Sequence, residues 1–362
     1  MGRLPGRARL RHDDRRVALP SPGVLRGARA GMSQRAVLAG EVRRVARSKC
    51  LGAALVIVLA AMAPLVLTVP YLRHLLVIGA LNVALALSFD LLAGHVGAVS
   101  LAHPAFFGLG AYTAAVLNTR WLVPAGVTLP AALLAGGLVA AALAVPFFRL
   151  SELSFAIGTL GLSLVAQAVA NNWVDVTGGA MCLTGIAAPA RTVLGAAVSP
   201  QVASYYLAAG IALGSAALYH LSTTFRLGRA LAAVQGDETF ASSFGFNPLR
   251  YKVLAFTLSG MVAAVVGGFY AHYANVICPN DLSTFLTINL LVMVFVGGLG
   301  SLRGVLVGAA VFTVVPELAR FAQVHSQLIY GILLLITVIY APEGLDRLLQ
   351  RSLRLRTGGR AA

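Results

Sequence analysis

Residues 223–252 read TTFRLGRALAAVQGDETFASSFGFNPLRYK, a long polar stretch inside a chain that is almost continuously hydrophobic from Leu51 to Pro342. Four basic and two acidic side chains fall within it. A segment of this length and charge is too large for a turn between two membrane spans. We therefore expect the hydrophobic part to lie in a lipid bilayer, and the polar insert to form a docking surface on one side of it.

The composition predicts an all-α, polytopic integral membrane protein. Apolar residues make up 58% and charged residues 11% of the 362 positions, whereas soluble domains average about 25% charged residues. A spanning helix needs roughly 20 apolar residues. About ten candidate spans follow, near 51–70, 75–93, 98–118, 122–146, 153–171, 202–222, 253–274, 283–300, 304–321 and 326–341.

Three parts of the chain follow from this pattern. Residues 1–49 are basic and predicted to be a disordered cytoplasmic segment, with a start at Met32 as an alternative. Residues 50–342 form the transmembrane domain, which includes the insert 223–252. Residues 343–362 form a basic cytoplasmic tail.

The positive charge is distributed unevenly along the chain. With the N-terminus in the cytoplasm and ten spans, all but four of the 28 Lys and Arg fall on the cytoplasmic side. The four on the outer side are Arg73, Arg120, Arg191 and Arg320. This is the positive-inside bias of membrane proteins, so it places both termini in the cytoplasm. It also favours contact with anionic lipid over binding of nucleic acid as the reason for the net charge of +16.

The third span is predicted to be broken. Ser100, His103 and Pro104 interrupt it, and proline removes a backbone donor and kinks or breaks a helix. Non-helical backbone at membrane depth is tolerated only where protein or a water-filled cavity covers it. We expect this break, and a second one near Gly297–Gly300, to face a transport pathway.

The sequence contains no motif for catalysis, for a metal or for a bound cofactor. It has no HExxH, and neither of its lysines follows a glycine-rich phosphate loop. Asp90 lies one turn from the end of its span and is interpreted as reaching the membrane interface. His272 is assigned to an aromatic belt. Cys182 and Cys278 both fall on the outer side, so a disulfide is possible, but single buried thiols are favoured.

The insert is predicted to hold one short helix over 228–244, ending near Gly245. This helix is too small to bury its own apolar face, made of Leu231, Val234 and Phe240. It therefore needs either a partner protein or the membrane surface.

Five ordered motifs carry a resemblance to a known family. They are GHVGAVSLAHPAFFGLGAYTAAVL (94–117), NNWVDVTGG (171–179), GRALAAVQGDETFASSFGFNPLRYKVLAF (228–256), VFVGGLGSLRGVLVGA (294–309) and APEGL (341–345). Together they resemble the membrane permease subunit of branched-chain amino acid ABC importers, the LivM type. The permeases of urea and short-amide importers look similar.

The resemblance implies a non-enzymatic permease in a bacterial inner membrane, working by alternating access. Its partners would be two separate ATPase subunits, a second homologous permease and a periplasmic substrate-binding protein. The insert would be the loop that couples the permease to the ATPases. The coupling residues would be Arg229, Asp237, Glu238, Ala241 and Gly245.

Eight residues are expected to line the pathway: Ser100, His103, Phe106, Phe107 and Tyr112 on the broken span, and Asn172, Thr177 and Gly179 at the outer mouth. The chain departs from the family pattern at Phe240, where alanine is usual, and at Met181-Cys182, where Asn-Gly is usual. The second departure lies near the outer mouth and leaves room for another small polar solute. An ion-coupled secondary transporter is the rival mechanism, with Asp90 and Glu317 as its only deep carboxylates.

Overall fold

The computed structural model describes residues 69–189, 200–319, 331 and 335. By contacts the chain divides into two units, 1–63 and 64–362, and every described residue belongs to the second. The basic segment 1–49 and the tail 343–362 lie outside the described residues, as do nearly all of the predicted spans 51–70 and 326–341. The count of ten spans therefore stays a prediction.

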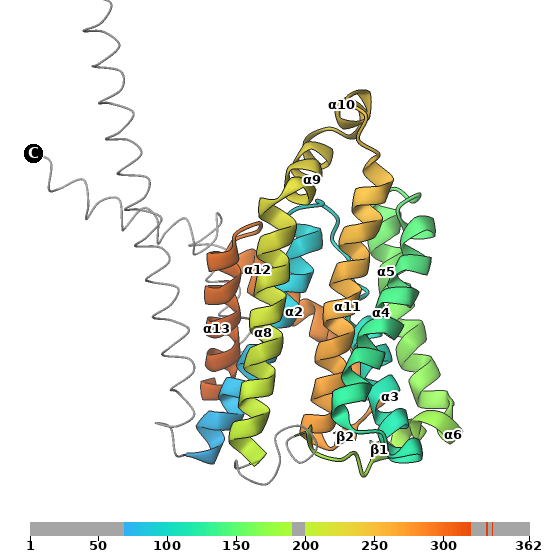
Figure 1. Ribbon diagram of the computed structural model, residues 1–362, viewed down its shortest axis with the longest axis vertical. Coiled ribbons are helices and arrows are strands. Elements are labelled where there is room, and N and C mark those ends of the chain that lie inside the picture. Colours follow the sequence, from blue (N-terminus) through green and yellow to red (C-terminus); the bar gives the residue numbers. More distant parts are fainter. Residues whose placement is uncertain (1–68, 190–199, 320–330, 332–334, 336–362) are drawn as a thin grey trace, which may run out of the picture. The chain divides into compact units, whose positions relative to one another are not determined.

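The described residues form helices joined by short connections (Figure 1). The longer helices are α2 (Pro70–Ala93), α3 (His103–Trp121), α4 (Ala125–Phe147), α5 (Glu152–Asn172), α8 (Pro200–Thr224), α11 (Pro248–Ala274), α12 (Thr284–Gly297) and α13 (Leu302–Ala319). The short elements are α6 (Val174–Thr177), η1 (Gly179–Met181), β1 (Leu183–Thr184), α9 (Arg226–Gly236), α10 (Glu238–Ser243), β2 (Val276–Ile277) and η2 (Pro279–Leu282).

Five of these helices, α2, α4, α5, α8 and α11, are long and apolar enough to cross a membrane. The prediction of a helical polytopic membrane protein is confirmed at this level. One small correction concerns the expectation of helices alone, because β1 and β2 pair as two short antiparallel strands. Their register sets Leu183 opposite Ile277 and Thr184 opposite Val276.

Local sequence explains where several helices begin. Pro70 and Pro248 stand in the first turns of α2 and α11, where a missing N–H costs nothing. The side chain of Asn247 also caps α11 by accepting a hydrogen bond from the Arg250 N–H. Ser151 caps α5 in the same way.

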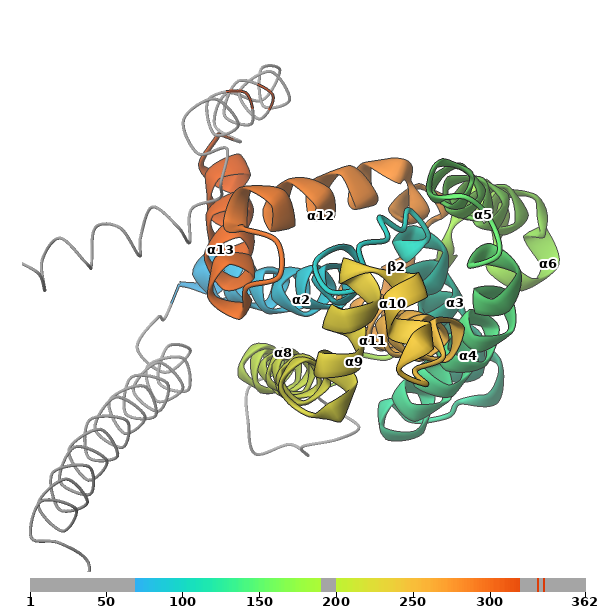
Figure 2. The same ribbon diagram turned by 90° about the horizontal axis from the view of Figure 1, so that it is seen from above.

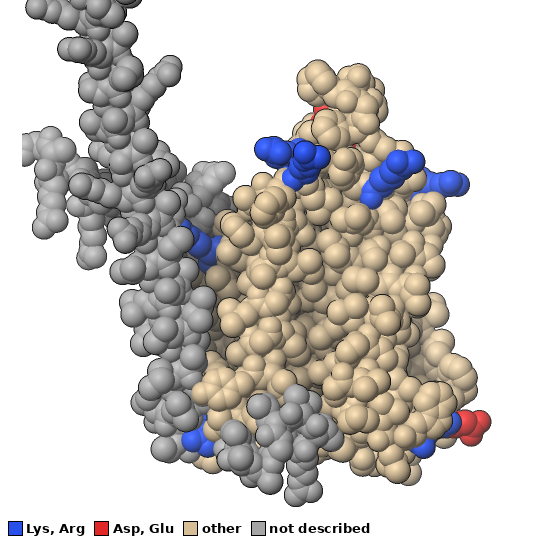
Figure 3. All heavy atoms as spheres, viewed as in Figure 1, with Lys and Arg blue, Asp and Glu red and all other residues tan. Residues whose placement is uncertain are grey.

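The helices run alternately between two ends of the second unit. We call the end with α9 and α10 the insert end, and the end with α6, β1 and β2 the strand end (Figure 1). Arg149, Arg226, Arg229, Arg250, Lys252 and Arg303 belong to segments at the insert end. Arg73 and Arg120 belong to the strand end, and Figure 3 shows the basic side chains gathered mostly around the insert end.

Helix α11 is the centre of the packing. It contacts α2, α3 and α4 along its length, and α9 and α10 lie over it in Figure 2. Phe256 of α11 is fully buried. The rings of Phe106, Phe148, Phe155 and Phe147 surround it at centroid distances of 5.4, 5.7, 6.2 and 6.5 Å. These aromatic contacts join α3, α4 and α5 to α11.

Glycines allow α3 and α11 to touch backbone to backbone. A Cβ atom added to Gly110 would overlap the backbone of Ala264, and one added to Gly267 would overlap that of Phe107. Apolar burial gives little drive for helix association in lipid, so close van der Waals contact between small residues takes its place. The glycines at this interface are thus required by packing.

We expect Gly110→Ala to destabilise the folded protein by about 1–3 kcal/mol, because overpacking forces the α3 and α11 backbones apart. Thermal unfolding of the detergent-solubilised protein, followed by tryptophan fluorescence, measures the change. Gly210→Ala on α8 is the matched control, since a Cβ there meets nothing within 4 Å. Equal melting temperatures for the two variants would contradict the close-packing argument.

Candidate functional site

The insert forms two helices instead of the single predicted helix over 228–244. Helix α9 ends at Gly236, and Asp237 takes an extended conformation before α10 begins. The Asp237 carboxylate accepts hydrogen bonds from the N–H groups of Thr239 (2.8 Å) and Phe240 (3.0 Å). A capping aspartate directly after a glycine stops one helix and starts the next, which is why the prediction of one helix is wrong. These donors hold the pKa of Asp237 below its ordinary value, so it is ionised at neutral pH.

The apolar face of the insert divides into two parts. Leu231 and Val234 of α9 are buried, with 0% and 2% of their surface exposed. Helix α9 contacts α8 and α11, so the membrane domain itself covers this part. The prediction that this face needs an outside partner is therefore wrong for Leu231 and Val234.

The other part remains exposed on α10. Phe240 and Phe244 are 62% and 67% exposed, and their ring centroids lie 4.8 Å apart. We call this pair the aromatic tip. Exposed apolar surface of this kind makes the aromatic tip a candidate interaction site.

Local contacts fix α10 beneath the aromatic tip. Ala241 is buried, and Gly245 has a φ of +83°, a conformation that favours glycine. Glu238 forms an ion pair with Lys252 of α11. Arg229 is exposed on α9. Four of the five predicted coupling residues therefore belong to α10 or its ends, and Arg229 lies on the preceding helix α9.

The predicted break in the third span is present. Helix α3 begins only at His103, and residues 95–102 between it and α2 form no regular helix. Two hydroxyl side chains of α5 satisfy this backbone. The Leu101 N–H donates to Thr159 Oγ1 (3.0 Å), and Ser163 Oγ donates to the Leu101 carbonyl (2.6 Å).

The pathway candidates at the start of α3 are buried. Ser259 Oγ lies 2.8 Å from the Ser88 carbonyl, to which it donates, and 3.1 Å from His103 Nε2. Because the Ser259 hydroxyl has one hydrogen, this network assigns the His103 proton to Nε2. Its Nδ1 is buried without a partner among the described residues. Ser100 is buried beside it, with its Oγ accepting from the Ala102 N–H.

Further along α3, three aromatic candidates face other helices. Phe106 packs on Phe256, and Phe107 packs on Tyr270 with ring centroids 5.5 Å apart. The Tyr112 hydroxyl is buried and, within the described part of the chain, has no hydrogen-bond partner. An unpaired buried hydroxyl is costly.

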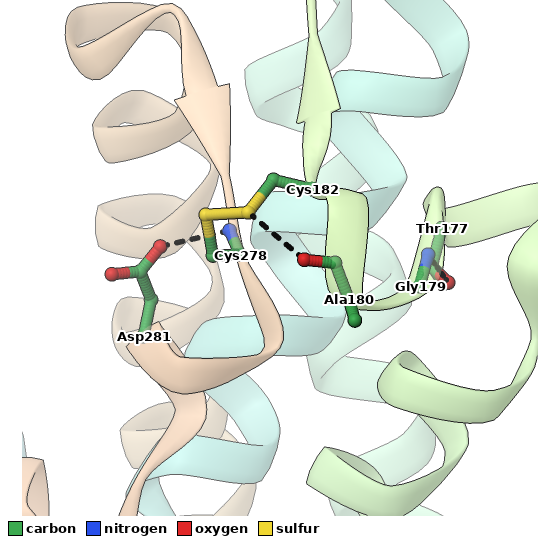
Figure 4. Close-up of a disulfide and its surroundings, with 6 residues drawn as sticks. All are labelled: Thr177, Gly179, Ala180, Cys182, Cys278 and Asp281. Carbon is green, nitrogen blue, oxygen red and sulfur yellow. Dashed lines mark hydrogen bonds between the residues drawn. A yellow bond between two sulfur atoms is a disulfide. The ribbon is translucent and has the colours of Figure 1, made fainter.

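The outer-mouth candidates form a separate group near the strand end. Thr177 Oγ1 donates to the Ala170 carbonyl (2.6 Å) and accepts from the Gly179 N–H (3.2 Å), so these residues shape the loop (Figure 4). Asn172 is exposed and donates to the Ala168 carbonyl. The structure therefore brings Thr177 and Gly179 together, and leaves Asn172 as the most accessible of the three.

Cys182 and Cys278 form a disulfide, so the prediction of single thiols is wrong. The two residues are 96 positions apart in sequence, with Cα atoms 4.4 Å apart (Figure 4). Cys182 directly precedes β1 and Cys278 directly follows β2, so the pairing of the two strands brings the cysteines together. The Asp281 carboxylate accepts from the Cys278 N–H (2.9 Å), and burial raises the pKa of that carboxyl above its ordinary value.

Two further side chains hold the segment after β1 at Ala187, and the sequence did not predict these contacts. Asn118 accepts from the Ala187 N–H (2.7 Å), and His272 Nδ1 lies 2.8 Å from the Ala187 carbonyl. The other ring nitrogen of His272 lies 2.7 Å from Thr128 Oγ1. His272 is fully buried, so its assignment to an aromatic belt is wrong. Nothing local in the sequence signals a partner 85 residues away.

Asp90 is also misplaced by the sequence interpretation. Its exposed fraction is 0%, so protein encloses its side chain and leaves it no access to water or lipid head groups. Tyr219 of α8 and the Gly300 backbone hold its carboxylate. The side chain of Glu317, the other deep carboxylate, lies outside the described residues.

Comparison with known proteins places these features in a family context. The family model described as branched-chain amino acid transport system / permease component matches residues 71–338. The high-affinity branched-chain amino acid transport system permease protein LivM of Escherichia coli K12 is 30% identical over 302 residues, which cover 76% of this chain and 70% of that protein. LivM of Salmonella typhimurium is 29% identical over 302 residues, which also cover 76% of this chain and 70% of that protein.

LivH, another permease protein of that transport system in Escherichia coli K12, is 22% identical over 292 residues, or 74% of this chain and 92% of LivH. No solved structure matches the chain.

We expect the native protein to carry one free thiol out of its three cysteines. Unfolded protein treated with a maleimide before reduction should gain one label, on Cys50, because Cys182 and Cys278 are paired. After reduction it should gain three. Intact mass measures both values, and three labels before reduction would contradict the disulfide. Cys182→Ser should restore a second free thiol, on Cys278.

Proposed function

The chain belongs to the family of branched-chain amino acid transport system permease components, and we propose that it is the membrane permease subunit of an ATP-driven importer of branched-chain amino acids. Its relatives are transport components and not enzymes. The observation that carries the proposal is the aromatic tip, an exposed pair of rings on a well-held helix at the basic end of the molecule.

The energy is proposed to come from ATP hydrolysis by two separate ATPase subunits, one of which docks on α10 of this chain. The insert has the properties that such a contact needs. Its outer side offers Phe240 and Phe244, while the ion pair of Glu238 with Lys252 ties it to α11. A displacement of α10 would therefore move α11 directly, and it would move α8 through the contacts of α9. Large apolar anchors at the centre of an interface supply most of its binding energy.

The orientation follows from the charges. Six described Lys and Arg belong to the insert end and two to the strand end. By the positive-inside rule the insert end faces the cytoplasm of a bacterial inner membrane. The strand end, with the disulfide, then faces the periplasm, where disulfides persist. A periplasmic binding protein would deliver solute there, and a second homologous permease would complete the pathway.

The solute path is proposed to run past the break before α3. Ser100 and His103 lie there, and Phe106, Phe107 and Tyr112 follow along the helix. Phe106 and Phe107 are closed against α11 in this structure. Movement of α11 would uncover them as an apolar wall suited to an aliphatic side chain, which is how alternating access would work here. Asn172, Thr177 and Gly179 would form the outer mouth.

Two alternatives differ in measurable ways. A permease for urea or another small polar solute would keep the ATP requirement and change the solute. An ion-coupled transporter would need a free coupling site, whereas both carboxylate oxygens of Asp90 already accept hydrogen bonds from protein groups. Uptake that survives loss of ATP but collapses with the proton or sodium gradient would favour it.

We expect the complex, assembled in nanodiscs with its ATPases, second permease and binding protein, to hydrolyse ATP faster when leucine, isoleucine or valine is added. Urea is the comparison solute and should give no stimulation. Stimulation by urea alone would move the proposal to the short-amide class. No stimulation by any solute, with uptake driven by an ion gradient, would overturn the ATP-driven mechanism.

We expect Phe240→Ala to weaken ATPase binding by about 2 kcal/mol, or roughly 30-fold in Kd, as truncation of an interface anchor does. Binding of purified ATPase to the nanodisc-embedded permease measures this. Phe225→Ala is the matched control, because Phe225 is also exposed (59%) but lies at the start of α9, away from the aromatic tip. Equal affinities for the two variants would argue against docking at the tip.

A further inference from the structure

A buried carboxylate joins three parts of the structure near the insert end. Asp90 lies in the last turn of α2, and its Oδ2 accepts a hydrogen bond from the Tyr219 hydroxyl of α8 at 2.5 Å. Its Oδ1 accepts from the Gly300 N–H, in the turn between α12 and α13, at 2.8 Å. Among the described residues no Lys or Arg forms an ion pair with it. Burial of a carboxylate is costly, so packing alone does not account for its presence.

The neighbouring glycine is fitted to this arrangement. The Gly94 N–H donates to the Asp90 carbonyl at 2.8 Å. A Cβ atom on Gly94 would collide with both the Asp90 carboxylate and the Gly300 backbone. The peptide after α2 is therefore pressed against the turn between α12 and α13.

The insert reaches the same peptide. Gln235, on α9, donates from its side-chain amide to the Gly94 carbonyl at 3.2 Å. Since α8 and α9 are consecutive helices, a closed ring results. It runs from Tyr219 through Asp90, Gly94 and Gln235, and back along α9 to α8. We call this the Asp90 ring.

We propose that Asp90 is a positioning residue that carries a displacement of the insert into α2 and the α12–α13 pair. The inference rests on the proposed ATP-driven transport. In a closed ring, α9 cannot move relative to α8 unless the Gln235 bond breaks or Gly94 and Asp90 move with it. Because the carboxylate has two acceptor oxygens, it holds Tyr219 and Gly300 at once, so a shift of α2 also moves the turn before α13. The ring is a contiguous physical route from the ATPase side to the spans.

The test is the number of solute molecules imported per ATP hydrolysed, measured on the full complex in proteoliposomes with leucine. Asp90→Ala removes the centre of the ring. Gln235→Ala opens it at an exposed side chain, where the fold is not at risk. We expect both variants to keep solute-stimulated hydrolysis and to import at least about fivefold less leucine per ATP, within the range found for coupled networks. The double variant should lose little more than Asp90→Ala alone, because both changes open one ring.

Thr313→Val is the matched control. Asn82 Nδ2 donates to Thr313 Oγ1 at 3.0 Å, so this bond also joins α2 to α13, but it has no link to the insert. Its loss should leave the ratio unchanged. A merely structural role for Asp90 would lower hydrolysis and uptake together.

Three results would overturn the inference: an unchanged ratio in Gln235→Ala, a parallel loss of hydrolysis and uptake, or an equal fall of the ratio in Thr313→Val. Failure of the proposed function is seen separately, in the wild type. A wild-type complex without ATP-dependent uptake contradicts that function, and the inference falls with it.

Discussion

Backbone polar groups inside a bilayer must find partners within the protein, and the rest of this structure depends on that constraint. Regular helices meet it on their own. The chain leaves the helical conformation at 95–102. Pro104 stands just after this segment, in the first turn of α3, and two glycines lie in or next to the segment. There Thr159 and Ser163 of α5 supply the missing hydrogen bonds to Leu101. The break is thus supported from a specific neighbour, which ties α5 to the start of α3.

The strand end and the insert end are held together by different kinds of contact. At the strand end, β1 and β2, a disulfide and the grip of Asn118 and His272 on Ala187 hold the loops together. At the insert end, α9 packs its apolar face on α8 and α11, and the described polar contacts of the insert are hydrogen bonds and one ion pair, with no covalent link. A strand end closed by a disulfide and an insert end without one would suit the transporter that we propose, in which movement of the insert drives the other helices. In that reading α11 links the two ends, because it begins beside α10 and ends at the β2 strand.

Helix packing in this chain is governed by small residues and rings. Gly110 and Gly267 bring α3 and α11 into backbone contact, while Phe256 gathers rings from three other segments. Such an interface is discrete, because interdigitated rings and touching backbones do not slide continuously. In the mechanism that we propose, opening of the α3–α11 contact would be a two-state step of alternating access and would uncover Phe106 and Phe107.

The sequence by itself determined the helical membrane class, the insert, the break before His103 and the family, because hydropathy, proline and ordered motifs are local signals. It also predicted a set of coupling residues within the insert, and their role in coupling stays a prediction. Only the tertiary structure decided which side chains meet across long separations. Cys182 pairs with Cys278, His272 reaches Ala187, and Asp90 joins Tyr219 and Gly300. It also divided the apolar face of the insert, covering Leu231 and leaving Phe240 exposed. Whether a side chain is buried or paired depends on which distant segment packs against it, and the residue spacing within one segment does not contain that information.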